Sequence, residues 1–121
     1  MKLLGHEEVK EMAITVNIFY CGVNGNARKF AEEMVASGVV HDIRAEEGNM
    51  RYEYFFPMDD KETVLLIDSW KDQHSIDSHH ASPMMAKITD LREKYDLHMR
   101  VERYVSDETG IPVADRAFVK E

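Results

Sequence analysis

The sequence predicts an α+β fold, an antiparallel sheet with helices on one face in the ferredoxin-like split βαβ arrangement. Segments with strand and helix periodicity follow one another in the order strand, helix, strand, strand, helix, strand. The third strand carries the apolar run Val64–Ile67, which is typical of a strand that is covered on both faces. In a chain of 121 residues, the helices can cover one face of the sheet. The other face is most simply covered by the sheet of a second copy of the chain.

The first part of the chain predicts one strand and one helix. Ile14–Cys21 alternates and is rich in β-branched and aromatic residues, as strands are. After the turn residues Asn24–Asn26, a helix is expected from Ala27, with a kink or break at Gly38 and the β-branched pair that follows it. The strand presents Ile14, Val16, Ile18 and Tyr20 on one face, and Thr15, Asn17, Phe19 and Cys21 on the other.

The middle of the chain predicts a hairpin. Met50–Phe56 and Thr63–Trp70 have the composition and alternation of strands. The polar segment Pro57–Glu62 between them is a suitable hairpin loop.

A broken helix and a last strand follow the hairpin. Asp72 or Ser75 can start a short helix that runs through His80. Ser82-Pro83 then restarts the helix, with serine as N-cap and proline at the first helical position. Leu97–Val105 alternates and is predicted as the fourth strand.

This organisation predicts one domain with two extensions. The domain spans residues 13–106, after an N-terminal extension at residues 1–12 and before a C-terminal tail at residues 107–121. The tail is expected to pack on a partner subunit, with a frayed terminus as the alternative. Its apolar side chains are Ile111, Val113, Phe118 and Val119.

Charge and cysteine content exclude several classes of function. A formal net charge of −8 argues against nucleic acid and against anionic membrane surfaces, which both require a basic face. Cys21 is the single cysteine, so neither an intrachain disulfide nor a thiolate zinc site is expected. The first residues are too short and too acidic for a signal peptide, and we expect a cytoplasmic protein.

The six histidines do not have metal-ligand spacing. His79 and His80 are adjacent and point about 100° apart on a helix, so they cannot chelate one metal together. His74 and His79 are also poorly spaced, and His6, His41 and His98 lie on separate predicted elements. We therefore expect no metal and no other cofactor, with His80 facing solvent.

The pattern from Glu47 to Lys87 is the most informative part of the chain. It contains a glycine turn, a hairpin whose second strand ends at Trp70, and a helix that carries His79. Trp70 and Tyr52 can also have purely structural roles. Trp70 can pack between sheet and helix, and Tyr52 can be an ordinary aromatic residue of the sheet. Asn17 is an amide inside an apolar strand and must be hydrogen-bonded if it is buried.

These motifs together resemble the antibiotic biosynthesis monooxygenase family over roughly residues 14–105. The matching segments are ITVNIFY with Phe30, EGNMRYEYF, VLLIDSW and IDSHHASPMM. The resemblance implies a homodimer whose two sheets form an α+β barrel, with a cavity in each subunit between sheet and helices. It also implies quinol oxidation by dioxygen without flavin, haem or metal. The residues around Val39–Asp42 and the long tail depart from the family pattern.

The resemblance assigns roles to six residues. His79 would exchange the proton, Asn17 would hydrogen-bond the oxyanion, and Tyr52, Phe19 and Trp70 would bind the aromatic ring. Arg51 is a further candidate for substrate binding. The expected function is therefore a cofactor-independent monooxygenase of a small quinol or phenol.

Three alternatives remain open. An isomerase of a phosphorylated sugar-like autoinducer would need cations for the phosphate, and Arg44 and Arg51 are the candidates. A haem-degrading relative shares Asn17 but differs at His79 and Thr89. A dimeric small-molecule-binding module without turnover is the non-enzymatic alternative.

Overall fold

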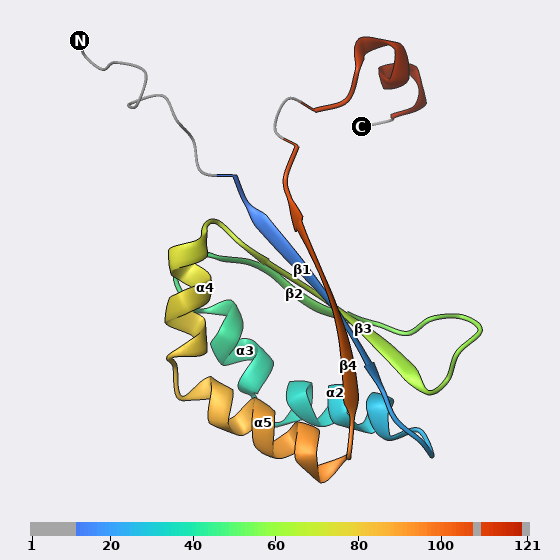
Figure 1. Ribbon diagram of the computed structural model, residues 1–121, viewed down its shortest axis with the longest axis vertical. Helices are drawn as coiled ribbons and strands as arrows, with labels where there is room; N and C mark the ends of the chain where they lie inside the picture. The colour runs from blue at the N-terminus through green and yellow to red at the C-terminus, as the bar shows by residue number, and fades with distance from the viewer. Residues whose placement is uncertain (1–11, 108–109, 120–121) are drawn as a thin grey trace.

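The computed structural model describes residues 12–107 and 110–119, and the expected α+β fold is confirmed (Figure 1). Within these residues, a four-stranded antiparallel sheet has the order β2-β3-β1-β4, and the helices lie on one of its faces. Residues 1–11 of the expected N-terminal extension, including His6, lie outside the described residues. In chain order the elements are β1 (Ile14–Cys21), α2 (Asn26–Ala36), α3 (Val39–Arg44), β2 (Asn49–Phe55), β3 (Thr63–Trp70), α4 (Gln73–His80), α5 (Met84–Lys94), β4 (His98–Val105) and the 3-10 helix η1 (Val113–Phe118).

Each of the two expected helices is broken in two. Gly38 has a φ of 89°, a left-handed conformation that glycine adopts without steric cost, and it separates α2 from α3 as predicted. Asp72 is the N-cap of α4, where its carboxylate accepts a hydrogen bond from the backbone N–H of Ser75. The expected cap at Ser82 is wrong, because its hydroxyl donates to the carbonyl oxygen of His79 and α5 begins at Met84.

The two faces of the sheet differ in what covers them. The strand register places Ile14, Val16, Ile18 and Tyr20 on the helix-covered face, so the predicted division of β1 is confirmed. On the other face no helix covers the sheet among the described residues, although Leu65 and Ile67 of β3 present apolar side chains there. We call this second surface the open face of the sheet.

The core lies between the sheet and helices α2 and α3. Phe30 and Met34 of α2, Ile43 of α3, and Leu66 and Trp70 of β3 are fully buried in it. Helix α5 packs mainly on the other helices rather than on a strand. A space therefore remains between α5 and the neighbouring strands β1 and β4.

Candidate functional site

A cavity of about 310 Å³ lies between the helix-covered face of the sheet and helices α4 and α5. Its volume is at the small end of the range for ligand sites, which suits a small molecule. The wall is mainly apolar, with a few polar and charged groups. The lining residues are Val16, Ile18, Tyr20, Tyr52, Asp68, Trp70, Ile76, His79, His80, Met85, Ile88, Arg92, Met99, Val101 and Arg103.

Asp68 is a buried carboxyl group in the wall of this cavity, with 8% of its surface exposed. The indole Nε1 of Trp70 donates a hydrogen bond to its Oδ1. Burial raises the pKa of Asp68 to about 7, because desolvation penalises the charged form more than the Trp70 hydrogen bond stabilises it. The negative charge of Glu46 raises this pKa further. Asp68 can therefore take or give a proton near neutral pH.

His79 lies beside Trp70 and is almost fully buried, with 4% of its surface exposed. The centroids of the two rings are 4.8 Å apart, and the ring planes are tilted by 30°. Nδ1 of His79 is 2.9 Å from Oε2 of Glu46. A carboxylate only accepts hydrogen bonds, so Nδ1 carries the proton, and Nε2 is left to exchange one with a ligand.

Local backbone geometry brings Glu46 to this histidine. Gly48 has a φ of 87°, and a Cβ there would lie 2.0 Å from Oγ of Ser75, so only glycine fits beneath α4. The backbone N–H of Lys71 donates to the carbonyl oxygen of Gly48 at 2.8 Å, which fixes the turn before β2 against the end of β3. This close approach places Glu46 on the inward side of α4, the side that also carries His79.

Three of the six residues that the sequence singled out line the cavity. Tyr52, Trp70 and His79 meet there from β2, β3 and α4. Burial raises the pKa of Tyr52 well above its usual value, so its phenol stays neutral and presents an aromatic surface. His80, expected to face solvent, is exposed and also lies at the cavity wall.

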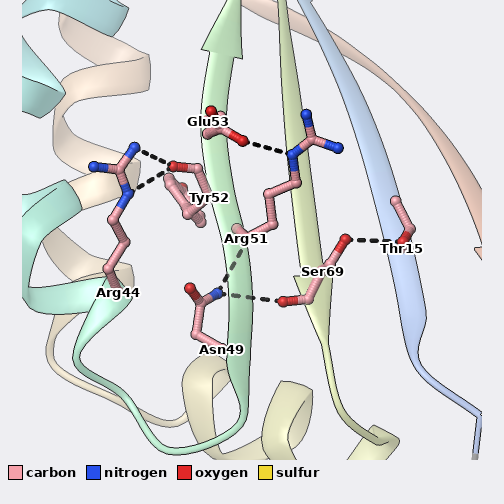
Figure 2. Close-up of polar contacts among 7 residues, drawn as sticks. All are labelled: Thr15, Arg44, Asn49, Arg51, Tyr52, Glu53 and Ser69. Atoms are coloured by element: carbon pink, nitrogen blue, oxygen red, sulfur yellow. Dashed lines mark hydrogen bonds and ion pairs between the residues drawn. The ribbon is translucent and has the colours of Figure 1, made fainter. Parts of the chain in front are cut away.

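The other three residues lie on the open face, so the structure does not bring Asn17, Phe19 and Arg51 to this cavity. Asn17 and Phe19 hold odd positions in β1, and successive side chains of a strand point to opposite faces. Arg51 forms an ion pair with Glu53 at 2.6 Å (Figure 2). Oδ1 of Asn17 is buried without a hydrogen-bond partner among the described residues.

Arg44, the other expected phosphate ligand, is also engaged elsewhere. Its Nε and Nη2 donate to the carbonyl oxygen of Tyr52 at 3.0 and 2.7 Å (Figure 2). Because β2 is an edge strand, this contact blocks part of its free edge. Arg44 therefore has a structural role at the edge of the sheet and does not line the cavity.

The sequence interpretation missed four polar residues near the cavity. Asp68 carried a usable signal, because it shares the alternation of Val64, Leu66 and Trp70 and so belongs on the same buried face. Glu46 lies 33 residues before His79, and no periodicity connects the two. Arg92 and Arg103 come from different elements that only the tertiary fold brings to one cavity.

The described residues also limit other kinds of site. Among residues 12–107 and 110–119, no group of three or more His, Cys, Asp or Glu side chains is placed to hold a metal ion. In the same ranges, no helix is long and apolar enough to span a membrane.

Comparison with known proteins gives one family. The model of the family described as "Antibiotic biosynthesis monooxygenase" matches residues 13–90, a span that includes Tyr52, Asp68, Trp70 and His79. No curated protein sequence matches the chain.

Several solved structures have the same fold. A Bacteroides thetaiotaomicron protein described as of unknown function and a possible oxidoreductase has a TM-score of 0.69 at 18% identity, covering 79% of this chain and 99% of its own. A proposed antibiotic biosynthesis monooxygenase from Deinococcus radiodurans has a TM-score of 0.70 at 15% identity, with coverages of 83% and 97%. SnoaB, a cofactor-independent oxygenase from Streptomyces nogalater, has a TM-score of 0.62 at 11% identity, with coverages of 78% and 93%. At these identities the likeness concerns the fold.

Proposed function

The chain belongs to the antibiotic biosynthesis monooxygenase family, and on this premise we propose that it oxidises a small aromatic quinol or phenol with dioxygen, without a cofactor. The observation that carries this proposal is Asp68, a buried carboxyl group whose pKa is raised to about 7, in an apolar cavity beside Trp70 and His79. The likeness to SnoaB, which is a cofactor-independent oxygenase, adds support.

The proposed reaction needs electrons from the substrate and proton transfer from the protein. A hydroquinone and dioxygen give a hydroxyquinone and water, so one oxygen atom enters the product and the substrate supplies all four electrons. Asp68 removes the proton from the ring hydroxyl, and the electron-rich anion then passes an electron to dioxygen. The two radicals combine to a peroxide, and loss of water completes the reaction.

The other cavity residues assist this sequence. Trp70 and Tyr52 provide aromatic surface for the substrate ring, with the indole held by its hydrogen bond to Asp68. His79, oriented by Glu46, delivers the proton that leaves with water. A proton exchange of this kind contributes typically about 10²- to 10⁴-fold to the rate.

Oxygen consumption with a panel of quinols and phenols tests the proposal. We expect uptake with at least one single-ring or two-ring quinol, because the cavity holds only about 310 Å³. No uptake with any member, together with tight binding of one of them, would favour the non-catalytic binding module. Turnover of a phosphorylated sugar without oxygen uptake would favour the isomerase.

We expect the purified protein to carry no chromophore and no stoichiometric metal. The proposed reaction uses only protein side chains and substrate electrons. The measurements are a visible absorption spectrum and elemental analysis of freshly purified protein. A flavin or Soret band, or one zinc per chain, would show that the reaction proceeds by another route.

The proposal includes a homodimer formed through the open face. Leu65, Ile67 and Phe19 present apolar surface there, and Oδ1 of Asn17 is buried without a hydrogen-bond partner among the described residues. Apolar surface on a sheet face favours association with a second copy of the chain. With a chain mass of 14.0 kDa, light scattering at micromolar concentration should return about 28 kDa, twice that mass. A stable 14 kDa species would exclude the two-sheet barrel.

The C-terminal tail is proposed to add to the same dimer. Val113 and Phe118 of η1 are 78% and 86% exposed within one chain, and both are large apolar side chains. Packing on the partner subunit would remove this surface from water.

A further inference from the structure

Four side chains, one from each strand, form a row across the helix-covered face of the sheet, and their chemical character changes from one end of the row to the other. The strand register pairs Tyr52 of β2 with Asp68 of β3, Asp68 with Val16 of β1, and Val16 with Arg103 of β4. Residues that pair directly across antiparallel strands present their side chains on the same face. All four of these residues line the cavity. The row therefore runs from a phenol and a carboxyl group, over an aliphatic side chain, to a guanidinium group.

The two ends of this row are separated by a distance that suits one aromatic ligand. Neighbouring strands lie about 4.8 Å apart, so the backbones at Asp68 and Arg103, two strands apart, are separated by about 10 Å. A benzene ring with a polar group at each end, and one hydrogen bond to each group, fits between side chains that extend from such positions. Val16 lies midway and provides the apolar contact for the ring.

Arg103 and Arg92 bring uncompensated positive charge to the cavity. Arg103 donates through Nη2 to the amide oxygen Oε1 of Gln73, and Nη1 of Arg92 lies 3.5 Å from the thioether sulfur of Met99. Both partners are neutral, and no ion pair joins either arginine to a carboxylate among residues 12–107 and 110–119. Burial raises the pKa of the Tyr20 phenol on the cavity wall, and the positive charge of Arg92, which reaches this phenol, offsets part of the rise.

The cavity arginines differ in this respect from two arginines of the open face. The protein carries a formal net charge of −8, so carboxylates are abundant. Arg51 and Arg100 are each paired with a glutamate at 2.6 Å, both on the open face. The cavity arginines thus remain free to bind an anion. Both also lie beyond residue 90, where the match to the family model ends.

We infer, on the basis of the proposed function, that the cavity binds a phenol or quinol that carries an anionic group, a carboxylate or a phosphate, held by Arg103 and Arg92 while the ring hydroxyl faces Asp68. A guanidinium binds either anion through charge-assisted, often bidentate hydrogen bonds. The carboxyl groups of Asp68 and Glu46 at the inner end repel an anion, so the charged group stays at the arginine end. The ring hydroxyl is then directed to the proton acceptor in one orientation.

Binding without oxygen separates this inference from turnover. Calorimetric titration under anaerobic conditions would use three probes: 2,5-dihydroxybenzoate, its methyl ester, and 4-hydroxyphenyl phosphate. Hydrogen bonds to charged groups contribute about 1.5–3 kcal/mol, so at least one anionic probe should bind about 10- to 100-fold more tightly than the neutral ester. The stronger of the two anionic probes identifies the group as carboxylate or phosphate.

Charge variants then test whether the two arginines cause the preference. Arg103→Gln should abolish most of the preference for the anion, and Arg92→Gln should reduce it, with affinity for the ester unchanged. Arg103→Lys keeps the charge but loses the bidentate geometry, and should retain part of the preference. The matched control is Lys87→Gln, which removes one positive charge from an exposed position of α5 outside the cavity. This variant should keep the full preference for the anionic probes.

The outcomes for the anionic ligand and for the reaction are separable. Equal affinity for ester and anions, no binding of any probe, or equal effects of Arg103→Gln and Lys87→Gln would each overturn the anionic-ligand inference. Oxygen uptake with neutral quinols alone would then leave the proposed function standing. Anion binding that depends on Arg103, without oxygen uptake by any anionic or neutral quinol, would confirm the ligand class and refute the monooxygenase.

Discussion

His79→Ala is expected to lower kcat/KM for quinol-dependent oxygen uptake by about 10²- to 10⁴-fold, the usual contribution of a positioned acid or base. The imidazole lies between the indole of Trp70 and the carboxylate of Glu46, and Nε2 is its remaining proton-exchanging atom. The measurement is the initial rate of oxygen consumption over a range of substrate concentrations. The melting temperature and the oligomeric mass should show that the variant remains folded and associated as the parent is.

His80→Ala is the matched control for this variant. Neighbouring residues on a helix point about 100° apart, and His80 is exposed where His79 is buried. Its removal trims the cavity wall without touching Glu46 or Trp70, so the rate should stay within a few-fold of the parent. If His80→Ala caused the larger loss, the assignment of the proton-exchanging histidine would be wrong.

Asp68→Asn should produce a loss of similar size and should change the pH dependence. The amide has the shape of the carboxyl group and can still accept the hydrogen bond from Trp70, but it cannot remove a proton. In the parent, the rate should rise with pH as Asp68 ionises, with a midpoint near its pKa of about 7. The variant should have no such rise. A parent-like rate and profile would exclude Asp68 as the base.

The same substitution should make the protein more stable at alkaline pH. Burial raises the pKa of Asp68 in the folded protein to about 7 from a usual value of 3.8, so the folded state binds the proton more tightly than the unfolded state does. Stability therefore falls as pH rises between about 4 and 7, by about 1.4 kcal/mol per pH unit and up to about 4 kcal/mol in total. Asp68→Asn removes this loss.

Urea unfolding of the parent and the variant at pH 5 and pH 8 measures this effect. We expect the stability advantage of Asp68→Asn to be larger at pH 8 than at pH 5, because the parent carries the buried charge only at the higher pH. An advantage that is equal at the two values would mean that Asp68 is not the group whose proton binding changes on folding.

Much of the fold could be predicted because its signals are local. The alternation of Ile14–Cys21 and the apolar run in the third strand identify the sheet, and Gly38 identifies the break between α2 and α3. The cap at Ser82 was wrong because its hydroxyl has a competing acceptor, the carbonyl oxygen of His79, that becomes available only once α4 is formed.

Part of the site could be predicted, since Tyr52, Trp70 and His79 all belong to the sequence pattern from Glu47 to Lys87. Trp70 is the last residue of β3, and His79 lies near the end of the short helix α4 that follows. Both side chains reach the cavity. Asn17 and Phe19 were misplaced because alternation divides a strand into two faces without showing which face the helices cover. Glu46 and Arg103 come to the site from distant elements, through a close turn at Gly48 and through the strand register.

Labelling with ¹⁸O₂ tests the central claim most directly. Purified, dialysed protein would be supplied with a quinol that supports oxygen uptake, in unlabelled water, and the product analysed by mass spectrometry at short reaction times. Cofactor-independent monooxygenation predicts one ¹⁸O atom in each product molecule and the other in water, with one dioxygen consumed per quinol and no added flavin or metal. A product without ¹⁸O, formed with release of hydrogen peroxide or only after a cofactor is added, would contradict it.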